Sequence, residues 1–359
     1  MTPELKKRIA QLRRGELPNG YRKTMLGIVP VSWNSQRVDE LCAITSGSTP
    51  KRNNPDYFTG DILWVTSGEL KSKYIFDTKE KITDSAAKDS GLVLYEPGTV
   101  VIAIYGLEAA GVRGTASIIA RKSTISQACM AFTKFQNVDN EFFYYWYLNH
   151  GEMIGLRYAQ GTKQQNLSVD IVGAFLVCFP EFHEQRKIGA ILSAQDTVIE
   201  LKERLLAEKR RQKKWLMQRL LTGKQRLPGF SGEWESVTLG DIAAYAKTHA
   251  KGERKNYVST ENMQSNYGAV IFSEKLPGFV DGIAYRKGDV LVGNIRPYLK
   301  KVWKADRNGV CSADVLVLRS SEIEPSYFYY LIARDAFFEY VMKSGKGTKM
   351  PRGDKTHII

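Results

Sequence analysis

The stretch that decides the fold runs from His183 to Leu221 and reads HEQRKIGAILSAQDTVIELKERLLAEKRRQKKWLMQRLL. It contains no proline, and its last glycine is Gly189. Apolar pairs recur every seven residues, at Ile191/Leu192, Val198/Ile199 and Leu205/Leu206. This period predicts one long α-helix with a narrow apolar stripe, of the kind that pairs with another long helix.

The length of this helix indicates its role. At 1.5 Å per residue it spans about 58 Å, more than a helix of one small domain needs. Gly223 and Pro228 follow it, as is usual after a helix C-terminus. We interpret it as a spacer between two domains. The alternative is an amphipathic helix packed on its own domain, whose stripe would be broader.

Composition limits the functional classes. The chain has 359 residues, enough for two or three domains, with 43% hydrophobic and 25% charged residues as in a soluble globular protein. Lys and Arg outnumber Asp and Glu by 52 to 38, and the net charge of +14 favours a polyanionic partner, nucleic acid before a membrane surface. No run would span a bilayer and the charged N-terminus excludes a signal peptide, so we expect a cytoplasmic protein without a membrane partner.

Cysteine and histidine spacing predicts no metal site. The cysteines form no CxxC pair and lie mostly in apolar surroundings, which predicts buried free thiols. They are Cys42, Cys129, Cys178 and Cys311. The histidines form no HExxH-like cluster, so zinc is not expected.

The sequence on the two sides of the long helix repeats. PVSWNSQRVDEL at 30–41 is echoed by SGEWESVTLGDI at 231–242, and both are expected to include a strand around the Trp. GTVVIAIY at 98–105 is matched by GDVLVGNI at 288–295, and β-branched content predicts a strand in each.

The repeat continues in the same order. The aromatic helix EFFYYWYLNH at 141–150 is matched by YFYYLIARD at 327–335, and the loop GTKQQNLS at 161–168 by GTKMPRGD at 347–354. A period of about 200 residues predicts two related domains, not a solenoid. We call the 161–168 and 347–354 segments the GTK loops.

The expected fold class is α+β, with two β-rich target recognition domains separated by a long coiled-coil-like helix. We expect an N-terminal basic helix and arm over 1–29, a first domain over 30–182, a helical spacer over 183–226 and a second domain over 227–359.

Several motifs resemble a known family, the DNA-specificity subunits of type I restriction–modification systems. GSTPKRNNPDYFTGDILWVTSGEL at 47–70 looks like that family's Gly-x-Thr-Pro…Tyr-Phe…Gly…Trp signature. YRKGDVLVGNIRPYLKKVW at 285–303 and GVCSADVLVLR at 309–319 are similar to another subgroup of its recognition domains. The hinge LLTGKQRLPGFSGEW at 220–234 also resembles the family. The resemblance covers essentially the whole chain.

The resemblance implies a non-catalytic subunit. Each recognition domain would read half of a bipartite site in double-stranded DNA, and the helical spacer would dock methyltransferase subunits and, through them, a restriction motor subunit. The chain itself would hold no cofactor. S-adenosylmethionine for adenine methylation, and ATP and Mg²⁺ for cleavage, would bind to the partner subunits.

The family's full-length members have a second spacer helix after the second domain. Here the sequence ends within the loop-to-strand region at 354–359, so we expect that helix to be absent. The apolar stripe then needs another cover. We expect either an antiparallel, two-fold homodimer through the spacer helix or solubility only with the methyltransferase partners.

The GTK loops are the first candidate DNA-binding segments. Lys suits phosphate, Gln and Asn suit adenine, and Arg suits guanine. The alternative is a solvated turn, but occurrence at equivalent places in both repeats favours binding. The candidates are Lys163, Gln164, Gln165, Asn166, Lys346, Lys349 and Arg352.

Two further polar segments are candidates for the same role. One lies in the first repeat, at Thr49, Lys51, Arg52, Asn53 and Asn54. The other lies in the second repeat, at Arg296, Tyr298, Lys300 and Lys301. The aromatic helices at 141–150 and 327–335 could stack on bases, but an aromatic stripe beside a sheet is more often core.

Two alternative functions belong to other classes. Pro55-Asp56 and Glu69-Leu70-Lys71 match a loose PD…(D/E)xK pattern, which would make the chain a stand-alone Mg²⁺-dependent nuclease. Such a short pattern arises easily by chance, and the second repeat lacks it. The other alternative is a scaffold whose domains bind protein and not DNA.

Overall fold

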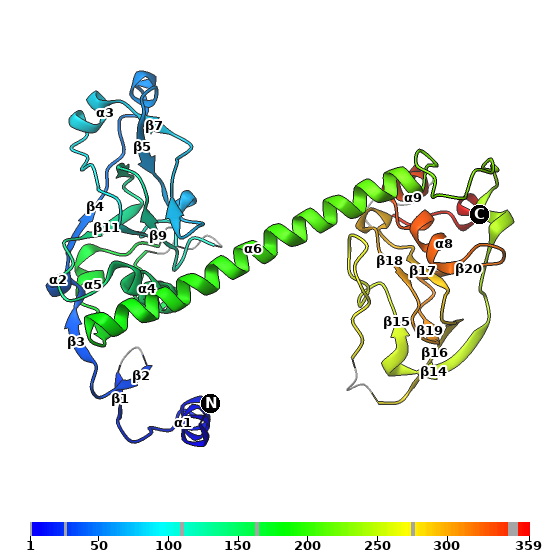
Figure 1. Cartoon of the computed structure of the whole chain (residues 1–359), viewed down its shortest axis with the longest axis horizontal. Coiled ribbons are helices and arrows are strands. Elements are labelled where there is room, and N and C mark those ends of the chain that lie inside the picture. Colours follow the sequence, from blue (N-terminus) through cyan, green and yellow to red (C-terminus); the bar gives the residue numbers. More distant parts are fainter. Residues whose placement is uncertain (1, 25–26, 108–110, 162–164, 274–276, 344–350) are drawn as a thin grey trace. The chain divides into compact units, whose positions relative to one another are not determined.

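The computed structural model describes residues 2–24, 27–107, 111–161, 165–273, 277–343 and 351–359 (Figure 1). The chain forms two compact units, Met1–Glu203 and Arg204–Ile359, which we call unit 1 and unit 2. Both mix helices with short strands, and the long helix α6 (Phe182–Leu220) lies in the chain between the β-rich parts. The α+β fold class with a long intervening helix is therefore confirmed.

Helix α6 matches the predicted long helix, 183–221, within one residue at each end, and it ends six residues before the predicted end of the spacer at 226. It has 39 residues, and only Gln185 and Gly189 are buried. All six residues of the apolar stripe are exposed, from 38% for Leu192 to 64% for Ile191. Nothing in the described parts of either unit therefore covers the stripe. No helix of the described residues is long and apolar enough to cross a membrane.

Unit 1 holds the first turns of α6 through a buried amide. The Gln185 side chain is fully buried, and its Oε1 accepts a hydrogen bond from the backbone N–H of Asp139 at 2.8 Å. Its Nε2 donates to the carbonyl oxygens of Asn137 and Pro180, both at 2.9 Å. Because Asp139 is the N-cap of α4 (Asn140–Tyr158), this single side chain ties the beginnings of two helices together.

A second polar cluster extends this anchor by two turns. The Lys73 ammonium forms an ion pair with Glu141 at 3.0 Å and donates to the hydroxyl of Ser193 at 2.8 Å. Tyr145 on α4 donates to Asp196 on α6 at 2.6 Å. The Lys73 side chain is only 11% exposed, so these interactions are better shielded than a surface ion pair.

Unit 1 is built on a five-stranded sheet. Its strand order is β4 (Ala43–Ser46), β11 (Cys129–Thr133), β8 (Val100–Ala103), β9 (Ala116–Ile119) and β6 (Tyr74–Ile75). A three-stranded sheet has the order β10 (Ser123–Ile125), β5 (Ile62–Val65) and β7 (Lys81–Ile82). The shorter helices are α1 (Pro3–Arg13), α2 (Val38–Leu41), α3 (Asp84–Asp89) and α5 (Val169–Gly173). Two further strand pairs are the hairpin β1 (Tyr21–Thr24) and β2 (Gly27–Pro30), and β3 (Asn34–Arg37) with β12 (Leu176–Phe179).

Unit 2 has two four-stranded sheets. The first has the order β13 (Ala243–Tyr245), β20 (Val315–Ser320), β17 (Val290–Gly293) and β18 (Val302–Lys304). The second has the order β14 (His249–Glu253), β16 (Phe279–Tyr285), β19 (Gly309–Cys311) and β15 (Tyr257–Val258). Its helices after α6 are α7 (Leu239–Ile242), α8 (Pro325–Ile332), α9 (Asp335–Lys343) and α10 (Lys355–Ile358).

The sequence repeat is a structural repeat. The antiparallel order β4-β11-β8 in unit 1 corresponds to β13-β20-β17 in unit 2, and a short helix, α2 or α7, precedes each first strand. Each unit also has a parallel pair, β10 with β5 and β19 with β15. The serine after each pair repeats one backbone hydrogen bond, from Ser126 to Val65 at 2.8 Å and from Ser312 to Val258 at 2.9 Å.

One predicted element of the second repeat is wrong. The Trp33 segment continues into β3, which pairs antiparallel with β12, but residues 231–238 around Trp234 form no strand. Trp33 packs edge-on against Phe142 at 6.3 Å, whereas Trp234 is 47% exposed. The reason is pairing, because the described residues of unit 2 contain no strand equivalent to β12.

The predicted core residues are mostly confirmed. Phe142, Phe143, Tyr144 and Trp146 on α4 are all buried, as expected of a core stripe. On α8 the prediction is only half right, since Phe328 is buried but Tyr327 and Tyr330 are exposed.

The four cysteines are free and buried, as predicted. Burial, with the neighbouring charge of Asp39, raises the pKa of Cys42 to about 12.

The Gln185 anchor gives a stability prediction. Gln185→Ala leaves two buried carbonyls and one N–H without their partner, and unpaired buried groups cost about 1–3 kcal/mol each. We expect the free energy of unfolding of unit 1 to fall by about 2–5 kcal/mol, measured by urea denaturation. Gln195→Ala, at an exposed position of the same helix, is the control and should change it by less than about 0.5 kcal/mol. Equal midpoints for the two variants would contradict the anchor.

Candidate nucleic-acid interface

The described residues 165–168 of the GTK loop of unit 1 are held against the residues that follow β8. The backbone N–H of Leu107 donates to the carbonyl of Gln165 at 3.2 Å, and that of Leu167 donates to the carbonyl of Ile104 at 2.9 Å. Tyr105 and Asn166 form an isolated β-bridge between these two hydrogen bonds. The loop that follows the central strand is thus paired with the predicted DNA-binding loop.

Unit 2 repeats this pairing at the end of β17. The backbone N–H of Arg296 donates to the carbonyl of Pro351 at 2.8 Å, and Gly353 donates to Asn294 at 3.3 Å. Ile295 and Arg352 form the corresponding β-bridge. Candidates that were far apart in sequence, Arg296 and Arg352, are therefore brought together. The candidates Lys163, Gln164, Lys346 and Lys349 lie outside the described residues.

Arg113 is a residue of the unit 1 interface that the sequence did not reveal. Its guanidinium donates to the side-chain oxygen of Gln165 at 3.0 Å. The side chain crosses α4 at Gly155, where an added Cβ would lie 2.6 Å from the Arg113 Cγ. Gly114 passes equally close to Gly151, so two helix glycines leave room for the 111–114 turn.

The sequence contained a signal for this arrangement. Gly111 and Gly114 are turn glycines, with φ angles of +79° and +73°. Gly151 and Gly155 are four residues apart on one helix face. Gly151 leaves room for Gly114, and Gly155 leaves room for the Arg113 side chain. Small residues at that spacing indicate close approach of another backbone.

A tight turn presents the unit 2 candidates. The 3₁₀ turn Pro297–Leu299 is flanked by Arg296 and Lys300, which both adopt left-handed conformations (φ +51° and +52°) that are uncommon for residues other than glycine. Tyr298, at the centre of the turn, is 50% exposed. The turn therefore presents an aromatic ring beside several cations.

The cations of this turn have different partners. The Lys300 ammonium lies 2.6 Å from a carboxylate oxygen of Asp335 and, together with the Tyr267 hydroxyl, holds the pKa of Asp335 below its usual range. Lys301 donates to the carbonyl of Thr260. Arg352 lies 3.0 Å from Asp314, with 59% of its side chain exposed. An exposed ion pair of that kind is worth little and can be exchanged for a phosphate.

The 49–54 loop of unit 1 is more constrained than the sequence suggested. Arg52 forms a two-pronged ion pair with Glu80 at 2.6 and 2.9 Å and lies over the rings of Phe58 and Trp64. The side chain of Asn54 caps the following 3₁₀ turn by accepting from the N–H of Asp56 at 3.3 Å. Lys51 and Asn53 are exposed, and Thr49 is half-buried.

The loose nuclease pattern has a structural explanation. One Glu69 oxygen accepts from the backbone N–H of Thr66 at 2.7 Å and from its hydroxyl at 3.1 Å, and the other accepts from the N–H of Lys79 at 2.6 Å. One oxygen thus caps the 3₁₀ turn Ser67–Glu69, and the other holds the backbone of Lys79. Within the described ranges, no group of three His, Cys, Asp or Glu side chains is placed to hold a metal ion.

The two interfaces offer groups for recognition. Amide side chains in unit 1 and guanidinium groups in unit 2 can donate to or accept from base edges, and the exposed lysines can neutralise phosphates. Gln165, Asn166, Arg296 and Arg352 lie on segments whose backbones are paired next to the end of a central strand, which fixes the position of these segments.

Comparisons with known proteins agree with this assignment. Residues 30–208 match the family model of the type I restriction modification DNA specificity domain. The type I restriction enzyme MjaIX specificity subunit of Methanocaldococcus jannaschii is 25% identical over 188 residues, which are 51% of this chain and 42% of that protein. The match thus spans less than half of the relative's length.

The fold has also been seen in a solved structure. The type I restriction–modification S subunit from M. genitalium aligns with a TM-score of 0.53 and 16% identity, over 91% of this chain and 79% of that one. At this identity the likeness concerns the fold alone. The match to the family model shows that the chain belongs to the type I restriction–modification DNA-specificity family.

The contact between Arg113 and Gln165 gives a prediction about sequence preference. If Arg113 holds Gln165 in place, Arg113→Ala and Gln165→Ala should alter the same half-site, and the double variant should lose no more affinity than the worse single one. A double-mutant cycle on DNA binding should give a coupling energy of about 0.5–3 kcal/mol.

Arg157→Ala removes an exposed arginine from α4 and is the control for lost charge. It should weaken binding to all sequences alike. Strictly additive losses for Arg113→Ala and Gln165→Ala would show that the two side chains act independently.

Proposed function

We propose that the chain is the DNA-recognition subunit of a type I restriction–modification complex, in which each unit reads one half of a bipartite site. The observation that carries the proposal is the repeated pairing of the GTK segment with the end of the central strand in both units. A family match alone would leave open which surface reads DNA, whereas this repeat indicates one equivalent place in each unit.

The two half-sites should differ in sequence. At the equivalent place unit 1 has Gln165 and Asn166, whereas unit 2 has Arg296 and Arg352. Amides pair well with adenine and guanidinium groups with guanine in the major groove. An asymmetric target, with different base preferences in its two halves, follows from this difference.

Catalysis in this proposal belongs to partner subunits. The exposed stripe of α6 is the surface proposed to dock methyltransferase subunits, and a restriction motor subunit would join through them. S-adenosylmethionine, ATP and Mg²⁺ would bind to those partners. The nuclease alternative loses its support, because both Glu69 oxygens accept backbone hydrogen bonds, one from Thr66 and the other from Lys79. A cytoplasmic location, where chromosomal DNA is accessible, is part of the same proposal.

Genome-wide mapping of methylated adenines tests the proposal directly. A strain with the gene should methylate one asymmetric bipartite motif, and deletion of the gene should abolish methylation of that motif. A charge-conserving Gln165→Asn strain should retain methylation but shift the preference in one half only. An unchanged methylation pattern after deletion would favour the scaffold alternative, in which the domains bind protein.

The exposed stripe gives a prediction about association. Leaving it in water is unfavourable by about 25 cal/mol per Å² of apolar surface, and the described residues provide no second long helix, since α4 has only 19 residues. We expect the purified chain to form a two-fold, antiparallel dimer through α6, or to be soluble only with its methyltransferase partners. Light scattering measures the mass in solution.

The matched variants separate the stripe from added charge. Ile199→Glu with Leu206→Glu should abolish association, whereas Ala194→Glu with Ala207→Glu, which adds the same charge off the stripe, should leave it intact. A wild-type chain that stays monomeric, folded and soluble without partners would contradict the prediction of association through α6.

A further inference from the structure

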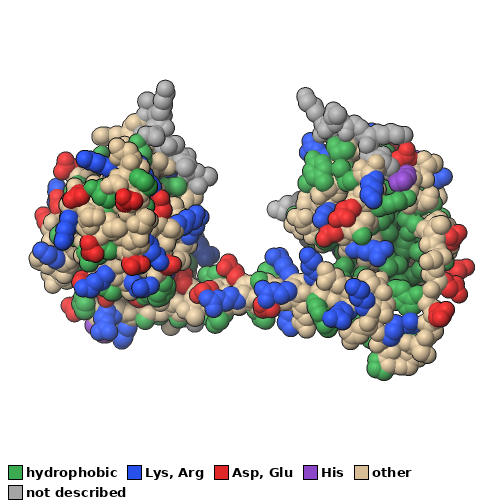
Figure 2. Space-filling view, turned by 90° about the horizontal axis from the view of Figure 1, so that it is seen from above, with side chains coloured by type: hydrophobic (Ala, Val, Ile, Leu, Met, Phe, Trp, Pro, Cys, Tyr) green, Lys and Arg blue, Asp and Glu red, His purple; other side chains and the backbone are tan. Residues whose placement is uncertain are grey.

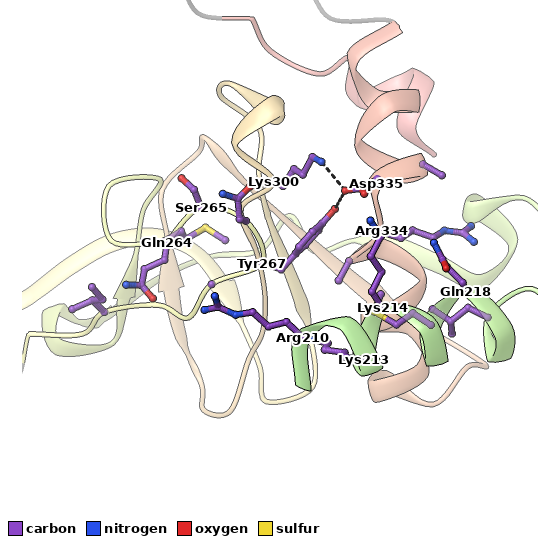
Figure 3. Close-up of a pocket in the computed structure, with 18 of the residues that line it drawn as sticks. Arg210, Lys213, Lys214, Gln218, Gln264, Ser265, Tyr267, Lys300, Arg334 and Asp335 are labelled. Carbon is purple, nitrogen blue, oxygen red and sulfur yellow. Dashed lines mark hydrogen bonds and ion pairs between the residues drawn. The ribbon is translucent and has the colours of Figure 1, made fainter. Parts of the chain in front are cut away.

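Unit 2 contains a basic cleft that shares only Lys300 with the candidate interface residues named above. It has a volume of 1310 Å³ and lies between the C-terminal part of α6, the 261–271 loop and the start of α9 (Figure 3). Its cations are Arg210, Lys213, Lys214, Lys300 and Arg334, and its only acids among the lining residues are Glu261 and Asp335. The cleft therefore has an excess of positive charge.

The acid at the centre of the cleft is already neutralised. Asp335 accepts from the ammonium of Lys300 at 2.6 Å and from the hydroxyl of Tyr267 at 2.7 Å. Lys214 also acts on it, since its charge contributes to the lowered pKa of Asp335. Lys213 lies over the ring of Tyr330, 5.5 Å from its centroid. The side chains of Arg210, Lys214 and Arg334 are exposed, and an anion is the ligand that their charge favours.

The exposed cations come from both walls. Figure 3 shows Arg210 extending from α6 toward the loop that carries Gln264 and Tyr267, and Lys214 pointing from α6 toward the pair formed by Tyr267 and Asp335. Arg334, on the opposite wall, extends toward Gln218 of α6. Figure 2 shows that Lys and Arg side chains also gather along α6.

The cleft is continuous with the candidate DNA interface of unit 2. Lys300 lines the cleft and also ends the turn that presents Tyr298. The cleft loop is bonded to that turn by two backbone hydrogen bonds, from Asn266 to Leu299 and from Tyr267 to Lys300, both at 2.9 Å. A ligand bound at the turn therefore reaches the cleft without leaving this surface.

We propose that this cleft binds backbone phosphates of the same DNA duplex whose bases unit 2 reads. The inference rests on the proposed function and extends it, because it assigns to the end of the spacer helix a direct contact with DNA next to the recognised bases. A phosphate chain is a better ligand for this cleft than an acidic peptide, because the cleft continues a surface that we propose to bind DNA. The cleft adds affinity and register without base preference.

The test uses the full-length chain and matched triple variants. The cleft variant combines Arg210→Gln, Lys214→Gln and Arg334→Gln, whose side chains are all exposed, so the fold should persist. The control combines Lys187→Gln, Lys202→Gln and Lys209→Gln, which remove the same charge from exposed positions of α6 outside the cleft. Binding to target and unrelated duplexes is measured between 50 and 200 mM salt, a range over which about 10³–10⁵ in affinity can be lost.

The slope of log affinity against log salt is the diagnostic readout. Each lost phosphate contact should reduce the slope by about 0.9, so the cleft variant should fall by up to about 2.7 and the control by much less. The cleft variant should weaken target and unrelated DNA by the same factor. Equal slopes for the cleft variant and the wild type, or equal decreases in both variants, would overturn the cleft as a phosphate site.

Failure of the proposed function would look different. In that case the wild-type chain itself would show no salt-dependent binding of DNA, and the inference would fall with it. If wild-type affinity falls steeply with salt and the cleft variant has the same slope, the proposal for the cleft is wrong. The proposed recognition function would be unaffected by that result.

Discussion

The candidate interface depends on one interaction, the backbone pairing between the GTK segment and the residues that follow the central strand. It occurs in unit 1 between 165–167 and 104–107 and in unit 2 between 351–353 and 294–296. Backbone pairing specifies a place without specifying side chains. The two units can therefore carry different recognition residues on the same support, which is what a reader of two different half-sites requires.

The long helix places a separate constraint on the molecule. In unit 1 it is held by the buried Gln185 amide and by the cluster around Lys73, so its first turns have a fixed direction. Farther on, its apolar stripe is exposed while its last turns carry the cations of the cleft. The helix thus combines an anchor to unit 1, an uncovered apolar surface and, in its last turns, a surface for an anionic ligand.

The periodic features of the chain were predictable from sequence. The seven-residue spacing located α6 within one residue at each end, and the matched motifs predicted two domains with corresponding central strands. Both rest on local patterns of apolar residues. The strand expected around Trp234 failed because a strand needs a pairing partner, and pairing is not a local property.

The interface itself was only partly predictable. The sequence suggested the GTK loops and the 296–301 segment as candidates. It did not show that Arg296 lies next to the β-bridge of Arg352, or that Arg113 donates a hydrogen bond to Gln165. Nor did it show that Arg52 is bound to Glu80 and Lys300 to Asp335. These contacts join residues separated by 28 to 56 positions in the chain, and only the folded geometry brings them together.

The central claim is that the two units are independent readers of two half-sites. Exchanging residues 30–182 for the same segment of a relative with a different target, followed by mapping of methylated sites, tests it most directly. The account predicts a hybrid motif in which one half changes and the other half is retained, with methylation still efficient. A motif altered in both halves would contradict it, because it would show that the two units do not read DNA independently.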